Sequence, residues 1–91
     1  MPKVDIYELV PYDVALLAKQ KGFEGSILTN YNEKGEQIER SHWFSNKELP
    51  LKQCIVPTYL ILNRWLLQKH NYNVGGLYPV KQDYIDALNT I

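Results

Sequence analysis

The segment at residues 57–70 carries apolar side chains on more than one side of a predicted helix. At about 100° per residue, one side holds Ile61, Leu62 and Trp65. Leu60 and Leu67 point almost the opposite way. A helix that is apolar on two sides needs two partners. We expect the first side to pack against the sheet, and the second to be covered either by the C-terminal helix or by another protein.

The first half of the chain predicts an arm, a helix and a hairpin. Residues 3–10 alternate only partly and favour a short strand or extended arm, and residues 12–21 have helical spacing. Gly22 ends this helix, and Phe23 follows where a Schellman motif places its hydrophobic contact. Residues 26–31 and 36–44 have the composition of two strands, with a turn at residues 32–35 between them. Ile38 and Phe44 are the residues of the second strand that we expect to face inward.

The second half begins with residues 45–53, a polar stretch broken by Pro50 in which we expect the greatest backbone freedom. Pro57 is suited to the first turn of the central helix, with Thr58 as a cap or first-turn residue. Asn71 can take the left-handed conformation where this helix stops, and Tyr72 can fold back onto it. Residues 73–78 predict a short strand. A last helix follows at residues 80–91, where apolar positions recur at helical spacing.

This order of elements predicts an α+β fold. We expect an antiparallel hairpin or sheet with two to three helices packed on one face. Ninety-one residues, of which 45% are hydrophobic, are enough for one small core but rarely for two. We therefore expect a single domain over residues 1–91.

Charge and cysteine content restrict the setting of the protein. Ten Lys and Arg balance ten Asp and Glu, so no global field attracts nucleic acid or an anionic membrane. The single cysteine, Cys54, excludes an internal disulfide and fits a reducing compartment. No segment reaches the ~18 uninterrupted apolar residues of a membrane span. The N-terminal residues also lack the apolar stretch of a secretion signal. We expect a cytoplasmic protein without a membrane partner.

Few residues suggest catalysis or metal binding. The soft metal ligands are His42, Cys54 and His70, and no two of them have the short spacing of a metal site. Cys54 could serve as a nucleophile beside a histidine, but its apolar neighbours Ile55 and Val56 favour a small buried residue. The carboxylates are spread along exposed segments, and no phosphate-binding glycine motif occurs. We predict no enzyme, no metal and no cofactor.

Two binding hypotheses remain. The first is docking to a partner protein or to a second copy, a homodimer, through the outer side of the central helix. Its candidate residues are Leu60, Arg64 and Leu67. The second is a nucleic-acid-binding accessory role for the hairpin, in which aromatic and cationic side chains alternate. Its candidate residues are Tyr31, Lys34, Arg40, His42 and Trp43. The same hairpin also carries three negative charges, at Glu33, Glu36 and Glu39, which weaken the clustered positive charge that nucleic-acid binding needs. Protein interaction is therefore the favoured hypothesis.

The chain also resembles a group of small uncharacterised proteins from phages and integrated mobile elements of gut Bacteroidetes. The resemblance covers roughly residues 7–74. It is carried by residues 13–23, by Asn30-Tyr31 with the following glycine turn, by residues 56–59, and by residues 64–71. This family has no assigned activity, ligand or catalytic residue. The resemblance therefore implies a phage or mobile-element origin and a shared fold, and it assigns no functional residue. We predict a non-enzymatic accessory or protein-interaction module of that origin.

Overall fold

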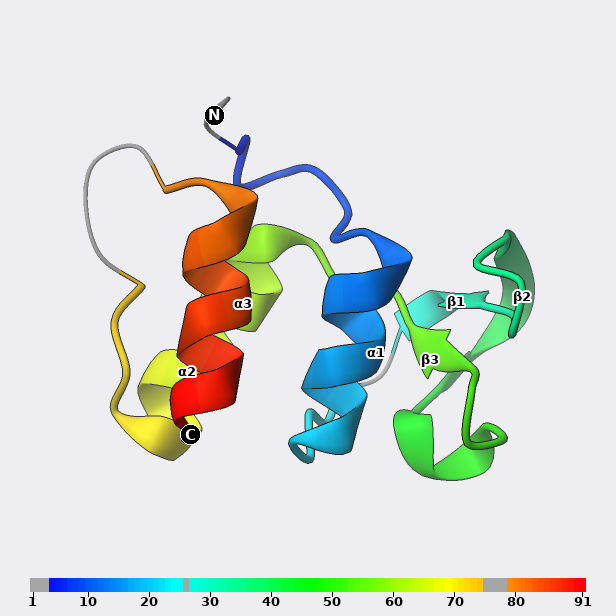
Figure 1. The fold of residues 1–91 in the computed structure, drawn as a ribbon. Coiled ribbons are helices and arrows are strands. Elements are labelled where there is room, and N and C mark those ends of the chain that lie inside the picture. The colour runs from blue at the N-terminus through cyan, green and yellow to red at the C-terminus, as the bar shows by residue number, and fades with distance from the viewer. Residues whose placement is uncertain (1–3, 26, 75–78) are drawn as a thin grey trace.

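The computed structural model describes residues 4–25, 27–74 and 79–91, and it shows an α+β domain. Three helices lie to one side of a small antiparallel sheet, and α1 stands between α3 and the sheet (Figure 1). The strand order is β2-β1-β3. The predicted fold class is confirmed. The elements are α1 (Tyr12–Gln20), β1 (Ile27–Tyr31), β2 (Gln37–Phe44), the 3-10 helix η1 (Asn46–Glu48), β3 (Cys54–Ile55), α2 (Tyr59–His70) and α3 (Lys81–Thr90).

Both predicted helix stops are confirmed. After α1, Gly22 adopts a φ of +91°, and the Phe23 N–H donates to the Ala18 carbonyl over 2.9 Å. After α2, Asn71 adopts a φ of +50°, and the Tyr72 N–H donates to a carbonyl six residues back in the chain over 3.1 Å. The bond after α1 is that of a Schellman motif, and at both ends the left-handed residue lets the chain turn back and satisfy an unpaired helix carbonyl. Phe23 then packs edge-on against Trp65, with ring centroids 5.3 Å apart.

The N-terminal arm caps the start of α2. The Tyr59 N–H donates to the Glu8 carbonyl over 3.1 Å, and the Leu60 N–H donates to the Ile6 carbonyl over 2.8 Å. The Thr58 hydroxyl accepts the Ile61 N–H over 3.3 Å. The first three N–H groups of the helix, which have no partner inside a helix, are therefore all satisfied. Pro57 is buried and precedes the cap, so its predicted place in the first turn is wrong.

The arm forms an isolated bridge between Leu9 and Thr58 and no regular strand among the described residues. Residue 3 of the predicted arm lies outside the described residues. So does residue 26 of the first predicted hairpin strand. The strand predicted at residues 73–78 falls mostly on residues 75–78, which are likewise not described, and residues 73 and 74 have no strand assignment.

The hairpin contains a large bulge. Asn32 builds the turn, because its side-chain oxygen accepts the N–H groups of Lys34 and Glu36. From the turn, β1 and β2 pair regularly as far as Thr29 opposite Glu39, but the next recorded pair is Ile27 opposite Phe44. One residue of β1, Leu28, thus faces four residues of β2, at positions 40–43. A bulge of this kind bends the strand and redirects its side chains.

The two residues of β2 that were predicted to face inward differ in burial. Asn30 pairs with Ile38, and Ile27 pairs with Phe44. Phe44 is buried and belongs to the hydrophobic core, whereas Ile38 is partly buried and lies outside it. The inward position of Phe44 is therefore confirmed, and that of Ile38 needs correcting, because its side chain does not pack against the core.

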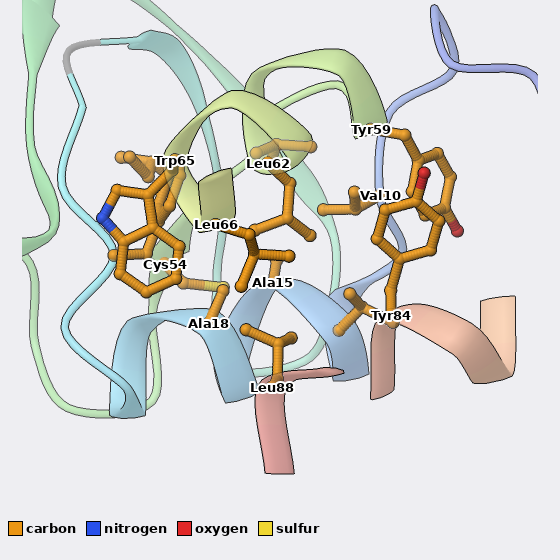
Figure 2. Packing of buried hydrophobic residues seen from close by; sticks show 14 of the residues in the cluster. Val10, Ala15, Ala18, Cys54, Tyr59, Leu62, Trp65, Leu66, Tyr84 and Leu88 are labelled. Carbon is orange, nitrogen blue, oxygen red and sulfur yellow. The ribbon is translucent and has the colours of Figure 1, made fainter. Parts of the chain in front are cut away.

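The core lies between the three helices and β3. Figure 2 shows Leu62 and Leu66 of α2 above α1, with Leu88 of α3 directed at the same space. Tyr59 and Tyr84 pack side by side, with ring centroids 4.6 Å apart. Leu62, Leu66, Tyr84 and Leu88 are fully buried. The C-terminal helix therefore covers the side of α2 that carries Leu62 and Leu66.

The burial of three apolar residues of α2 bears on the sequence predictions: Ile61 differs from its prediction, and Leu60 and Leu67 show whether α3 covers the outer side of the helix. Ile61 was expected to pack on the sheet with Leu62 and Trp65, but it is 39% exposed. It is the third residue of the helix, at the edge of the core. Leu60 is partly buried, and its N–H is bonded to the arm. Leu67 is 53% exposed, so α3 does not cover it.

Residues 45–53 are tied to α1 and to the strands, against the expectation of backbone freedom. The Lys19 ammonium donates to the carbonyls of Leu49, Pro50 and Gln53, at 3.3, 2.5 and 2.6 Å. Buried Asn46 donates to the Phe23 carbonyl and accepts the N–H of Ile55. Together these bonds satisfy backbone groups that a short irregular segment cannot satisfy alone.

We predict that Lys19→Met lowers the free energy of unfolding by about 2 kcal/mol, because three carbonyls lose a charged donor. Urea denaturation followed by circular dichroism measures the change. Lys21→Met is the matched control, since the Lys21 side chain makes no hydrogen bond or ion pair within the described part of the chain. Equal losses for the two variants would contradict the role of Lys19.

Candidate functional site

The most distinctive surface feature is an apolar groove of about 310 Å³. Four large apolar side chains that line it are exposed: Leu9 by 43%, Leu28 by 37%, Trp43 by 66% and Ile61 by 39%. The remaining lining residues are Ile27, Thr29, Val56 and Thr58. Exposed apolar side chains scattered singly are ordinary, but a contiguous group marks a site of interaction. We call this surface the apolar groove.

Four separate segments bring these side chains together. The arm supplies Leu9, which the Leu9–Thr58 bridge holds beside the start of α2. The Thr58 cap fixes the first turn of α2 and with it Ile61. The bulge in β2 supplies Trp43, and β1 supplies Leu28. The groove therefore depends on the register of the hairpin and on the docking of the arm.

The interface predicted on α2 lies apart from this groove. Leu67 and Arg64 are exposed, whereas Leu60 is partly buried. None of the three lines the apolar groove. Leu67 is exposed, as the interface prediction required, but no sequence pattern pointed to Leu9, Leu28 and Ile61. The weak alternation of the arm and of β1, and the helical spacing of α2, give no indication that these three residues meet.

The residues predicted to contact nucleic acid do not form one surface. Tyr31 is buried, and its hydroxyl donates to the Val10 carbonyl over 2.6 Å. Lys34 lies in the hairpin turn. Trp43 lines the apolar groove, whereas Arg40 and His42 line a different pocket. A stacking platform needs aromatic faces and cations side by side, and the bulge separates them.

Cys54 is an inert buried thiol. Its side chain is fully buried beside α1. Burial raises the pKa of Cys54 from 9.0 to about 11, and the nearby Lys19 ammonium offsets part of the rise. Burial likewise lowers the pKa of Lys19, with the sulfur of Cys54 acting in the opposite direction. Since the thiolate is the nucleophile, this cysteine is unreactive at neutral pH.

Tyr59 and Tyr84 are two further buried polar side chains. Burial raises the pKa of Tyr59 to about 12, with further contributions from Tyr84 and nearby carboxylates. Burial also raises the pKa of Tyr84, which the neighbouring amide of Asn63 partly offsets. Both phenols are therefore neutral in ordinary conditions. Within residues 4–25, 27–74 and 79–91, no group of three or more His, Cys, Asp or Glu is arranged to hold a metal ion.

Comparison with protein-family models, with curated proteins and with solved structures finds no match to this chain. In the described part of the chain, no helix has both the length and the apolar character to cross a bilayer. The site must therefore be interpreted from its own geometry.

We predict that native Cys54 reacts with iodoacetamide at pH 8 about a hundred-fold more slowly than the unfolded chain, because a pKa difference of about 2 lowers the thiolate fraction by that factor. Between about pH 9 and about pH 11 the thiol ionises in the unfolded chain but not in the folded protein. The free energy of unfolding should therefore fall as the pH rises through this range. Mass spectrometry with and without urea measures the labelling. Cys54 is the single cysteine, so the signal reports one site. Equal rates in both states would contradict its burial.

Proposed function

We propose that this protein is a non-catalytic protein-interaction module and that the apolar groove is its docking surface. The observation that carries the proposal is the convergence of Leu9, Leu28, Trp43 and Ile61 from four segments onto one groove. A buried apolar centre with a polar rim is the common anatomy of a protein interface. The volume of about 310 Å³ is at the lower end of ligand pockets, which favours insertion of a single large side chain.

The occupant that we propose is a second copy of this chain. Trp43 projects from the wall of the groove and is two-thirds exposed. In a two-fold symmetric pair, the same patch serves both copies, so the Trp43 indole of one copy can enter the groove of the other and the reverse. A large net charge of one sign would make two copies of a chain repel each other. The formal net charge here is zero, so no such repulsion opposes a dimer.

Pairing along the free edge of β2 is a poor route to association. β2 is an edge strand of the sheet. Its four bulged residues depart from the straight geometry that a second strand would need, and Glu39 and Arg40 place charges on it. Bulges and charges are the devices by which sheet edges avoid pairing. Side-chain packing in the groove is therefore the mode that we propose.

The nucleic-acid role remains a second hypothesis with weaker support. Arg40 and His42 share a pocket, but Trp43 lies elsewhere and Tyr31 is buried. In this pocket the formal positive charge that drives counterion release is thereby reduced to Arg40, which lies beside the carboxylate of Glu48. The phage or mobile-element origin and the cytoplasmic location stay predictions from the sequence, and neither enters the argument for the groove.

The sharpest test is Ile61→Glu compared with Leu67→Glu. Ile61 is the third residue of α2, and the Thr58 hydroxyl already accepts its N–H. A glutamate there can complete a capping box with Thr58 and favours the positive helix end, so the variant should keep or gain stability. It also places a carboxylate in the groove. We expect self-association to weaken at least about ten-fold, because covering the groove with a second copy would desolvate the carboxylate, at a cost above the 1.4 kcal/mol of one decade.

Sedimentation velocity over a concentration series measures association, and thermal unfolding confirms that each variant folds. Leu67→Glu adds the same charge to the same helix outside the groove and should dimerise like the unaltered chain. Trp43→Ala should also weaken the dimer. An unaltered chain that stays monomeric throughout, or a dimer lost in Leu67→Glu and retained in Ile61→Glu, would contradict the proposal.

A further inference from the structure

A second pocket, of about 450 Å³, lies where β2 meets the segment after η1. β2 contributes Arg40, His42 and Phe44, and Glu48 with Leu49 and Pro50 forms the facing wall. Unlike the apolar groove, this pocket combines a guanidinium, an imidazole and a carboxylate with apolar surface. It lies apart from the groove and shares no lining residue with it.

Arg40 is held in place by a buried amide. Its Nε donates to the Oδ1 of Asn30 over 2.9 Å, and Asn30 is fully buried, with its own Nδ2 donating to the Tyr31 carbonyl. The guanidinium also lies 5.7 Å from the centroid of the Phe44 ring. Within the described residues its terminal nitrogens have no hydrogen-bond acceptor and no ion-pair partner. The two terminal amino groups of Arg40 therefore present parallel donors in a fixed orientation, which suits bidentate binding of an anion.

The opposite wall is equally constrained. The Lys19 ammonium fixes the backbone at Leu49, Pro50 and Gln53 from the side of α1. The Glu48 carboxylate accepts the Ser45 N–H over 3.0 Å, which orients it locally. A pocket whose walls are set by such bonds loses little entropy when a ligand enters.

The lining selects the type of anion. Arg40 supplies one positive charge and Glu48 one negative charge, so the lining cannot neutralise a dianion such as a phosphate, whereas the planar guanidinium of Arg40 matches a single carboxylate. The apolar surface of Phe44, Leu49 and Pro50 accommodates a hydrocarbon body. We propose that this pocket binds an organic monocarboxylate with an apolar body, with the carboxylate on Arg40 and the body against Phe44. This proposal is independent of the docking role of the groove.

The test is titration of the full chain with 4-phenylbutyrate, followed by ¹H–¹⁵N correlation spectra. We expect saturable shifts of the Arg40 Nε–Hε signal and of the amides of His42, Leu49 and residues 51–53. The Arg40 Nε–Hε signal should be visible and slow to exchange before ligand is added, because it is bonded to Asn30. Arg40→Gln should weaken binding at least about ten-fold, since it removes a charged hydrogen-bond donor pair. Lys34→Met removes one positive charge from the same hairpin and should leave the affinity unchanged.

Four comparison ligands complete the test. 4-Phenylbutyramide, which lacks the charge, should bind at least about ten-fold more weakly. Phenyl phosphate should bind more weakly than the carboxylate. An apolar dipeptide with a free C-terminal carboxylate should bind if the natural source is a peptide end, and its C-terminal amide should not. Absence of saturable shifts with 4-phenylbutyrate, equal binding of the amide, or tighter binding of phenyl phosphate would overturn the proposal. None of these outcomes bears on self-association through Ile61.

Discussion

The register shift between β1 and β2 is the constraint on which both surfaces of this protein depend. One residue, Leu28, faces four residues of β2. A hairpin without the bulge would continue the pairing of Thr29 with Glu39 and place the aromatic and cationic side chains along one regular ribbon. The observed shift places Trp43 in the apolar groove and leaves Arg40 and His42 in the second pocket. A single irregularity in the backbone therefore produces two chemically different sites.

Long-range polar contacts hold this irregular hairpin in place. Lys19 reaches from α1 to the segment that faces β2, and Asn46 joins the end of α1 to β3. Asn30 bonds across the hairpin to Arg40 within the bulge itself. Each contact involves a buried or partly buried polar group whose partners are satisfied. Such groups favour one arrangement over others because an unpaired alternative is costly.

The fold class, the helix ends and the hairpin turn could be predicted because their signals are local. Gly22 with Phe23, and Asn71 with Tyr72, act within one helical turn. The exposure of Ile61 could not be predicted from periodicity, because it depends on how the N-terminal arm docks onto the first turn of α2. The apolar groove was missed for the same reason: Leu9 and Ile61 are 52 residues apart in the sequence, and no pattern announces that they meet. The bulge was missed because the alternation of residues 36–44 is equally compatible with a regular strand.

The most direct test of this account is the register of the hairpin in solution. Cross-strand nuclear Overhauser effects between β1 and β2 report which residues are paired. We predict contacts between Thr29 and Glu39 and between Ile27 and Phe44, as in the structure. Contacts between Ile27 and Ser41, which would extend the first register without a bulge, would contradict the account of both surfaces.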